Sequence, residues 1–345
     1  MSNGISITHV FRCAVLPIML LCAARGMAAN RRFISRVDSI LTTRLERMQA
    51  KVDSDYIRLP DNVWVFRGLA NVGQTSADIR GNYGDSTRYR SNFNTDVRTS
   101  MTLTASYRGF VAGFTVNPAR WAGRNKDMEL YILGYGNRFG IEALLQSANT
   151  YSGNIRLYNT KGTLFSSVAI DKGYLSQRGI TLNAYYALNY KHFSYPAAFT
   201  HAYVQTRSAG SLMFNASYQL NQLTRSNMLY ENENLLDRIT TNMIGVGAGY
   251  AYNFVPSYHW LIHISCLPSF IVFQHNTLHY KDNNSQRMHY TFPEVIIFAQ
   301  HSTIYSWKNF FAGINMSLHF SNIGQDNIYY DNLTWRMRAL FGVRI

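Results

Sequence analysis

Cysteine is nearly absent from this chain of 345 residues, which contains three. Cys13 and Cys22 lie in an N-terminal stretch that we expect to be removed on export, which leaves Cys266 as the one thiol of the mature chain. A single thiol cannot form an intrachain disulfide, and it excludes a metal site built from several thiolates. The histidines are scattered along the chain, so we expect no metal ion and no cofactor.

Charged residues and long apolar runs are also scarce. Asp, Glu, Lys and Arg make up 15% of the chain, against about 25% in a typical soluble domain. The mean hydropathy is -0.16, and no uninterrupted apolar run approaches the roughly 20 residues that a spanning helix needs. These shortages argue against a helical membrane protein. They leave a membrane β-barrel open, because its strands alternate and average to neutral hydropathy.

Acidic residues are outnumbered by basic ones, 19 to 33. Removal of the N-terminal stretch takes away Arg12 and Arg25 and no acid, so the mature chain keeps 31 basic residues and a net charge of +12. A basic exported protein is suited to lipopolysaccharide phosphates or to an anionic solute. Because the basic residues are dispersed and no nucleic-acid-binding motif is present, we expect no nucleic-acid partner.

The start of the chain is typical of a secretory signal peptide. Arg12 precedes the apolar stretch CAVLPIMLLC, and small residues follow it. A cut after Ala28 places Gly26 and Ala28 at the two positions where export signals carry small residues. We therefore expect a cleaved signal peptide over residues 1–28.

Residues 29–62 differ from the rest of the chain. Apolar residues recur here at the spacing of a helix, namely Phe33, Val37, Ile40, Leu41, Leu45 and Met48. We expect this segment to form a short amphipathic helix on the periplasmic side, followed by one β-domain over residues 63–345.

From residue 63 onward, apolar residues recur with a period of two. In 180–190, 244–254 and 310–320 one face is apolar, and the other carries mainly small or polar residues such as Gly, Asn, Ser and Thr. A soluble sandwich usually carries many Lys and Glu on its outward face, whereas a barrel in lipid needs an apolar exterior and a polar or packed interior. The pattern predicts an all-β chain that forms a transmembrane antiparallel β-barrel.

The connections between strands predict their number. Long and short connections alternate, as in bacterial outer-membrane barrels, whose short turns face the periplasm. The count is about fourteen strands, with twelve as the alternative because 163–170 and 199–207 are the weakest. Residues 72–98 form the longest predicted loop and 171–179 a short turn. The predicted strands are 63–71, 99–107, 110–117, 128–136, 139–148, 163–170, 180–190, 199–207, 211–221, 241–254, 258–273, 292–304, 309–320 and 333–345.

The last strand, LTWRMRALFGVRI, is apolar on one face, and its other face carries Arg336, Arg338 and Arg344. We assign the arginine face to the lumen. Glu142 is also expected there, where it is suited to pair with an arginine. Basic rings favour anions in pores, but they equally brace a packed wall, and both roles stay open. The strand ends on Ile345 instead of the aromatic residue that barrel-assembly machinery usually reads, and this machinery is an expected partner.

The stretch FSYPAAFTHAYVQTRSAGS is the densest polar constellation. On a strand, His201, Gln205 and Arg207 share a face, and Ser211 begins the inward face of the next strand. A His and a Ser on neighbouring strands are the base and nucleophile that a barrel-embedded lipid hydrolase needs. Such a site also needs a group that orients the His and a donor for the oxyanion, and the sequence identifies neither. A polar network that packs the lumen is the favoured interpretation.

Four segments resemble the DUF4421 family of outer-membrane barrels from Gram-negative anaerobes and their relatives. They are DSDYIRLPDNVWVFRG near residue 53, YRGFVAGFTVNPARW at 107, YGNRFGIEALLQSANTYSG at 135 and FSYPAAFTHAYVQTRSAGS at 193. The likeness runs over most of the mature chain. It implies a barrel, and it implies neither a substrate nor catalytic residues.

Three classes of function fit these observations. We expect a non-enzymatic outer-membrane protein of a Gram-negative bacterium: a pore, a transport component or a surface-assembly protein. A barrel-embedded lipid hydrolase or deacylase is the alternative, and a secreted soluble glycan-binding β-domain is the second alternative. The expected partners are outer-membrane lipid and lipopolysaccharide, with an anionic solute or another protein as further candidates.

Overall fold

The computed structural model describes residues 43, 51–59, 64–83, 87–107, 110–118, 122–123, 127–225, 236–280, 284–287, 294–325 and 328–345. The chain divides into two compact units, residues 1–50 and residues 51–345, and every strand belongs to the second. The expected signal peptide and, apart from Thr43, the expected amphipathic helix lie outside the described residues.

The described part of the second unit consists almost entirely of strands, and it includes the short helix α5 (Tyr195–Phe199). The strands are β1 (Ile57–Arg58), β2 (Trp64–Tyr83), β3 (Thr87–Asn94), β4 (Arg98–Tyr107), β5 (Phe110–Val116), β6 (Met128–Tyr135), β7 (Phe139–Asn159), β8 (Leu164–Ala187), β9 (Val204–Gln205), β10 (Ala209–Arg225), β11 (Leu236–Ser257), β12 (Trp260–Gln274), β13 (Thr277–Tyr280), β14 (Ser285–Arg287), β15 (Val295–Trp307), β16 (Phe310–Gln325) and β17 (Ile328–Arg344). Within the described residues, no helix is long and apolar enough to cross a membrane.

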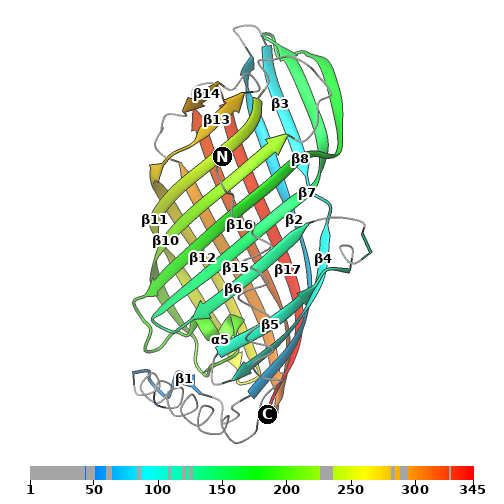
Figure 1. Ribbon diagram of the computed structural model, residues 1–345. Coiled ribbons are helices and arrows are strands. Elements are labelled where there is room, and N and C mark those ends of the chain that lie inside the picture. Colours follow the sequence, from blue (N-terminus) through cyan, green and yellow to red (C-terminus); the bar gives the residue numbers. More distant parts are fainter. Residues whose placement is uncertain are drawn as a thin grey trace, which may run out of the picture. The chain divides into compact units, whose positions relative to one another are not determined.

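Ten of the described strands close into a ring (Figure 1). The order is β2–β3–β7–β8–β10–β11–β12–β15–β16–β17, with β17 hydrogen-bonded to β2, and each pairing is antiparallel. The ladder between the last and the first strand runs from Arg344 opposite Val65 to Ile328 opposite Gly81. At the level where these ten strands pair with one another, they satisfy one another's backbone groups and leave no sheet edge.

In the lower half of the ring, near the C-terminus, apolar side chains point outward and polar ones inward. On β11, Ile244, Val246 and Tyr250 are exposed, while on β10 Ser217 and Gln219 are buried inside the ring. This arrangement follows from the alternation of a strand, which sends successive side chains to opposite faces. The polar interior and the exposed apolar wall agree with the face assignments made from the sequence.

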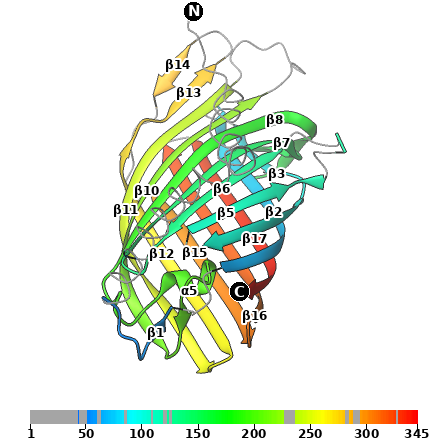
Figure 2. The same cartoon turned by 60° about the horizontal axis from the view of Figure 1, so that its bottom comes forward.

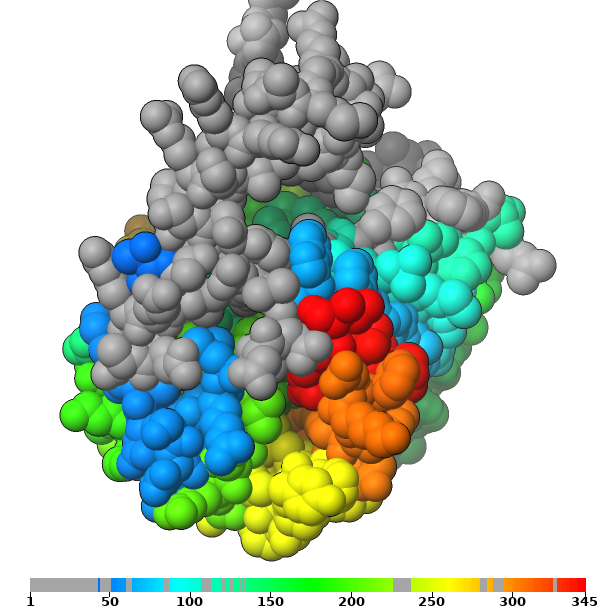
Figure 3. Space-filling view, turned by 90° about the horizontal axis from the view of Figure 1, so that it is seen from below, coloured from blue at the N-terminus to red at the C-terminus, as the bar shows by residue number. Residues whose placement is uncertain are grey.

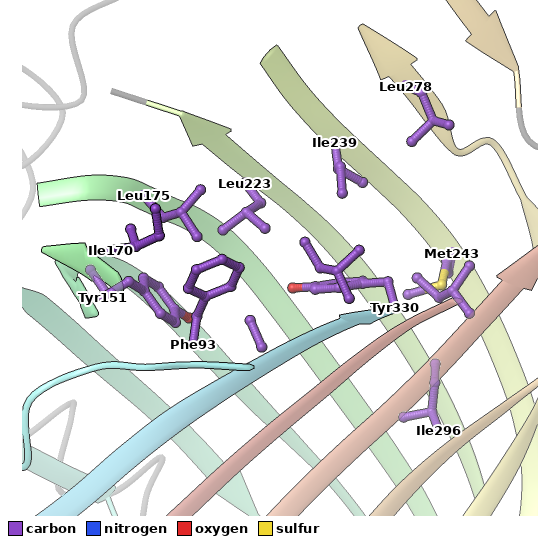
Figure 4. Packing of buried hydrophobic residues seen from close by; sticks show 14 of the residues in the cluster. Phe93, Tyr151, Ile170, Leu175, Leu223, Ile239, Met243, Leu278, Ile296 and Tyr330 are labelled. Atoms are coloured by element: carbon purple, nitrogen blue, oxygen red, sulfur yellow. The ribbon is translucent and has the colours of Figure 1, made fainter. Parts of the chain in front are cut away.

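In the upper half the polarity inside the ring is reversed. A single apolar cluster fills the interior, and every strand of the ring contributes to it (Figure 4): Ala77, Ile79, Phe93, Ala148, Tyr151, Ile170, Leu175, Leu223, Ile239, Met243, Ile271, Leu278, Ile296, Ile323 and Tyr330. On the outside of β2 and β17, Asp78, Arg80 and Asp331 replace the apolar side chains found lower down. The upper half is therefore packed like a soluble β-domain.

This reversal explains why some strands were predicted too short and why one long strand was predicted as two. Residues 72–98 are not a loop, because β2 extends to Tyr83 and the chain returns as β3 and β4. Residues 163–190 are not two strands with a turn at 171–179, because β8 runs unbroken from Leu164 to Ala187. The outward-facing residues of the upper half are polar, so in the sequence they resemble loops. In the structure they form the solvent-exposed face of strands that continue upward.

The segment between β8 and β10 lies inside the lower end of the ring, where Figure 2 shows α5. Ser194 caps α5 by accepting a hydrogen bond from the Ala197 amide, with Pro196 in the first turn. Its carbonyls are held from the wall: Arg67 donates to Phe199 O at 2.8 Å and Ser302 donates to Ala198 O at 2.8 Å. Residues 188–208, which we call the plug, thus fill the lower bore.

The strand predicted at 199–207 was therefore wrong. Its first residue ends α5, and only Val204–Gln205 form a strand, β9, which pairs with β1 in a separate two-stranded sheet. The segment is apolar at Phe199, Ala202 and Tyr203, all of which are buried. Alternation of polar and apolar residues is not specific enough to separate a strand in the wall from a chain that packs inside it.

One part of the wall is incomplete. Below β3 the chain bends at residues 95–97 into β4, which pairs with β2 and β5, and β6 pairs with β7. Among the described strands, β5 pairs only with β4 and β6 only with β7, although β5 and β6 are neighbours. We call the line between β5 and β6 the seam. Above it, the β3–β7 ladder closes the wall again from Asn94 opposite Ser152.

Figure 3 views the lower end of the ring and shows the last residues of the chain, in red, beside the turn between β15 and β16, in orange. The Arg344 amide donates to Asn309 O at 2.8 Å, and the Ile345 amide donates to Trp64 O at 2.9 Å. Backbone hydrogen bonds thus join Ile345 to the start of β2 and Arg344 to the turn between β15 and β16.

Candidate functional site

Three arginines and one carboxylate meet inside the ring at the level where the seam ends. Arg336 on β17, Gly73 on β2 and Arg98 on β4 stand directly opposite one another in the sheet register. Arg338 follows two residues later on the same inward face of β17. Glu129 on β6 forms an ion pair with Arg336 and also lies within the electrostatic reach of Arg98 and Arg338. We call these four charged residues the luminal arginine cluster.

Arg98 leaves part of its hydrogen-bonding capacity unused. It is 7% exposed, and its Nη2 donates to Thr75 Oγ1 at 2.7 Å. Its Nε and Nη1 donate no hydrogen bond to any described residue. A buried guanidinium with unused donors is costly. The arrangement therefore favours an anion that accepts from these atoms.

Gly73 gives the cluster its space. A Cβ added there would lie 2.7 Å from Trp335 O and 3.0 Å from Arg336 Cγ. Both distances are shorter than ordinary contacts, and the carbonyl belongs to a paired strand that cannot yield easily. A side chain at this position would push the two opposed arginines apart.

We expect Gly73→Ala to destabilise the protein by about 1–3 kcal/mol, the usual effect of forcing atoms into a packed site. The measurement is urea unfolding of the protein refolded in detergent micelles. Gly68→Ala is the matched control on the same strand, since the nearest atom to its added Cβ is Leu103 Cδ2 at 3.8 Å. Equal midpoints for the two variants would contradict this account of Gly73.

Two further arginines hold the plug and the lower rim. Arg67 donates to Thr104 Oγ1 at 2.9 Å as well as to Phe199 O. Arg344 places its guanidinium 4.5 Å from the centre of the Phe311 ring. The other contact of that ring is His201, stacked at 4.4 Å between ring centres. These arginines brace the packed lower end, and they differ in this respect from Arg98.

The four segments singled out above are part of a longer match. The model of the family described as "Domain of unknown function (DUF4421)" matches residues 51–344. The chain belongs to the DUF4421 family. No curated protein matches it.

Several solved outer-membrane proteins are similar to the DUF4421 chain. The outer membrane protease OmpT from Escherichia coli is 10% identical over 83% of this chain and 97% of its own, with a TM-score of 0.44. The translocator domain of the autotransporter NalP from Neisseria meningitidis is 12% identical over 91% of this chain and 98% of its own, with a TM-score of 0.32. The toluene transporter TodX of P. putida is 11% identical over 83% and 91%, with a TM-score of 0.26.

The structure places the predicted luminal residues of this DUF4421 chain at several different points. Arg336, Arg338 and Arg344 share the inward face of β17. Gln205 is buried in the plug, where its Oε1 accepts from the Ser194 amide at 2.9 Å. Arg207 does not lie in the lumen: it is exposed and forms an ion pair of 3.6 Å with Asp55. The assignment of Arg207 failed because the strand predicted to carry it does not exist.

Glu142 is inside the ring, but it pairs with no arginine among the residues that the structure describes. It is 4% exposed and accepts a hydrogen bond from the Tyr135 hydroxyl. It lines a cavity of about 10 Å³ together with Tyr185, Asn183 and other side chains, which is space for about one water. Glu129, four residues higher in the β6–β7 register, reaches Arg336 instead.

His201 and Ser211 are not brought together as a base and a nucleophile. The Ser211 hydroxyl donates to Leu212 O at 2.8 Å and accepts from the Asn189 amide at 2.9 Å. His201 stacks on Phe311 of β16, whereas Ser211 lies on β10. Within the described residues, no group of three or more His, Cys, Asp or Glu side chains is placed to hold a metal ion.

Proposed function

We propose that this protein is an outer-membrane β-barrel that serves as a closed transport component. In this proposal an anionic amphiphile passes between the lumen and the bilayer through the seam, with its charged group on the luminal arginine cluster. The observation that carries the proposal is the pairing of an unbonded seam with a buried, incompletely bonded Arg98 at its upper end.

The membrane location is supported by the length of the apolar exterior. Outward-facing residues of β16 are apolar from Phe310 to Phe320, which is eleven residues. At about 3.3 Å per residue and a tilt of about 45°, such a segment spans about 25 Å, the height of the apolar band of outer-membrane barrels. With β4, β5 and β6 in the wall, we infer a transmembrane belt of twelve strands. In this proposal the lower ends of β2 and β17 face the periplasm.

The closed state is supported at both levels of the lumen. The apolar cluster fills the upper half, and Phe93, Met243 and Tyr330 within it are at most 3% exposed. The plug fills the lower half, where Tyr195 is 1% exposed and hydrogen-bonded to Gln300. An open aqueous pore would need both fillings to leave, so a lateral route is the simpler one.

The lateral route is supported by the lack of strand pairing between β5 and β6 among the described residues. The bilayer core offers no water to unpaired backbone groups, so an unbonded pair of strand edges is the weakest line of a membrane wall. Thr115 on β5 shares the inward face with Thr102, to which it is hydrogen-bonded at 2.8 Å, and yet it is exposed. The Glu129–Arg336 ion pair joins β6, on one side of the seam, to β17, on the other side.

The experiment that tests this proposal combines fractionation with conductance. We expect the mature chain to fractionate with outer membranes, to migrate on gels in a heat-modifiable way, and to show no steady conductance in planar bilayers. Recovery as a soluble periplasmic protein would overturn the membrane location. A stable open channel would overturn the closed lumen and restore the simple pore, since fully plugged barrels do not conduct.

The alternative as a lipid hydrolase receives no support from His201 and Ser211, which bind different parts of the wall and plug. A soluble glycan-binding domain is disfavoured by the exposed apolar belt, because soluble monomers rarely expose so large an apolar surface.

A further inference from the structure

A second basic site lies on the outer surface, above the apolar belt. Arg80 on β2 stands directly opposite Arg90 on β3, and Arg90 stands directly opposite Arg156 on β7. All three are exposed. They form an unbroken row across three strands, which we call the outer arginine row.

Such a row is unfavourable on its own. Directly opposite residues in an antiparallel sheet have Cβ atoms about 4.5–5.5 Å apart, and like charges in that relation destabilise the sheet. Arg80 is partly compensated by Asp331, at 3.2 Å. Among the described residues, neither Arg90 nor Arg156 forms an ion pair. The repulsion is therefore unrelieved at two of three positions, and an external anion would remove it.

The surroundings of the row fit a phosphate-bearing lipid surface. Tyr329 flanks it, with the Arg80 guanidinium 5.5 Å from the ring centre. Arg88, two residues before Arg90, is a fourth exposed arginine on the same face. Asp78 is the acid next to the row on β2, and its carboxylate accepts a hydrogen bond from Asn92. Four arginines against two aspartates leave this face strongly basic.

The height of the row matches the polar region of a membrane. On β17 the outward apolar residues end at Leu333, and Tyr329, which is opposite Arg80, lies four residues above it. Four residues of a tilted strand rise about 10 Å. The headgroup layer is about 5–8 Å thick on each side of the hydrocarbon, so the row stands at the outer edge of that layer.

We propose that the outer arginine row binds the phosphate groups of lipopolysaccharide in the outer leaflet. The spacing across the row allows one phosphate to accept from two neighbouring guanidinium groups, each of which can donate two parallel hydrogen bonds to it. The inference rests on the outer-membrane location proposed above, and it names a lipid partner that the luminal cluster does not contact.

The test compares two triple variants of the purified full-length mature protein in detergent. One is Arg80, Arg90 and Arg156→Gln. The matched control is Arg58, Arg207 and Arg287→Gln, which removes the same charge from exposed positions elsewhere. The probe is fluorescent lipopolysaccharide, native or enzymatically dephosphorylated. We expect the row variant to bind native lipopolysaccharide about tenfold more weakly or worse, the control to be unchanged, and the dephosphorylated form to bind both poorly.

A second measurement separates binding from folding. Without lipopolysaccharide the row variant should unfold at a higher urea concentration than the wild type, because like-charge repulsion is gone; with saturating lipopolysaccharide the order should reverse. If both triple variants lost affinity for lipopolysaccharide equally, the effect would depend on net charge alone, and the proposal would be overturned. Displacement of lipopolysaccharide by millimolar inorganic phosphate would assign the row to a free anion instead. Membrane fractionation of the wild type is independent of these results, so a failure here leaves the proposed function standing.

Discussion

Phe93→Ala should unfold the protein more readily by about 3–5 kcal/mol, as for a large aromatic side chain in a well-packed core. Phe93 is 3% exposed and lies in the apolar cluster to which every strand of the ring contributes. The cavity left by its removal cannot collapse easily, because the surrounding side chains are held by a closed ring of paired strands. Urea unfolding in micelles, followed by intrinsic fluorescence, measures the change.

The matched control is Phe165→Ala. Phe165 lies on β8, is 58% exposed, and precedes Ser167, which stands opposite the outward Arg156. We expect its substitution to change stability by about 0.5 kcal/mol or less. If the two variants are equally stable, the interior of the upper half is not a packed core and the lumen is open at that level.

Glu129→Gln should loosen the seam. The change leaves Arg336 buried without its carboxylate, and removing one partner of a buried ion pair costs about 3–5 kcal/mol. Arg336 is 7% exposed and the Glu129 side chain 25% exposed, so we expect the lower end of that range. The double variant with Arg336→Gln should recover part of the loss, because the buried charge that Glu129 paired is removed as well.

The opening itself is measured by the distance between spin labels at Val116 on β5 and Leu130 on β6. Cys266 is the only cysteine among the described residues and is exposed, so Cys266→Ser provides the background. We expect longer and broader distances for Glu129→Gln than for the wild type. Dodecyl phosphate should have the same effect on the wild type, since it competes for the arginines, whereas dodecyl maltoside should have none.

Glu142→Gln is the control for this experiment. Glu142 is also a buried carboxylate beside β6, but its partner is Tyr135 on β6 itself and not a residue across the seam. The label distance should therefore stay at the wild-type value. A seam that widens equally in both variants, or in neither, would contradict the role given to the Glu129–Arg336 pair.

The sequence predicts the faces of strands well, because alternation reports which residues share a side. The assignment of Arg336, Arg338 and Arg344 to one face and Trp335, Met337 and Phe341 to the other matches the structure. It does not predict where a strand stops once it leaves the apolar belt. Above the belt the outward face becomes polar and the inward face apolar. This is the reverse of the pattern expected of a strand in lipid, so these segments were predicted to be loops.

The luminal arginine cluster was predicted less well from the sequence than the faces of the strands. Arg98 lies in residues 72–98, which were predicted to be a loop, and Glu129 was not among the residues predicted to face the lumen. The short turn at residues 137–138 could have placed Glu129 in the lumen, because it fixes the β6–β7 register. Glu142 stands opposite position 133 of β6, and Glu129 lies four residues from that position, so an inward Glu142 predicts an inward Glu129. The contact with Arg336, in contrast, crosses the wall and has no local signal.

The incomplete wall also determines the width of the barrel. With twelve strands at the level of β5 and β6 and ten above, where β3 pairs directly with β7, the circumference falls by two strand spacings, about 10 Å. The interior is thus a funnel with its narrow end filled by the apolar cluster and its wide end near Ile345. Hydrogen bonding between β5 and β6 would narrow the wide end of the funnel, and their separation would widen it, so this one line of contact between strands sets the width of the ring below the arginine cluster.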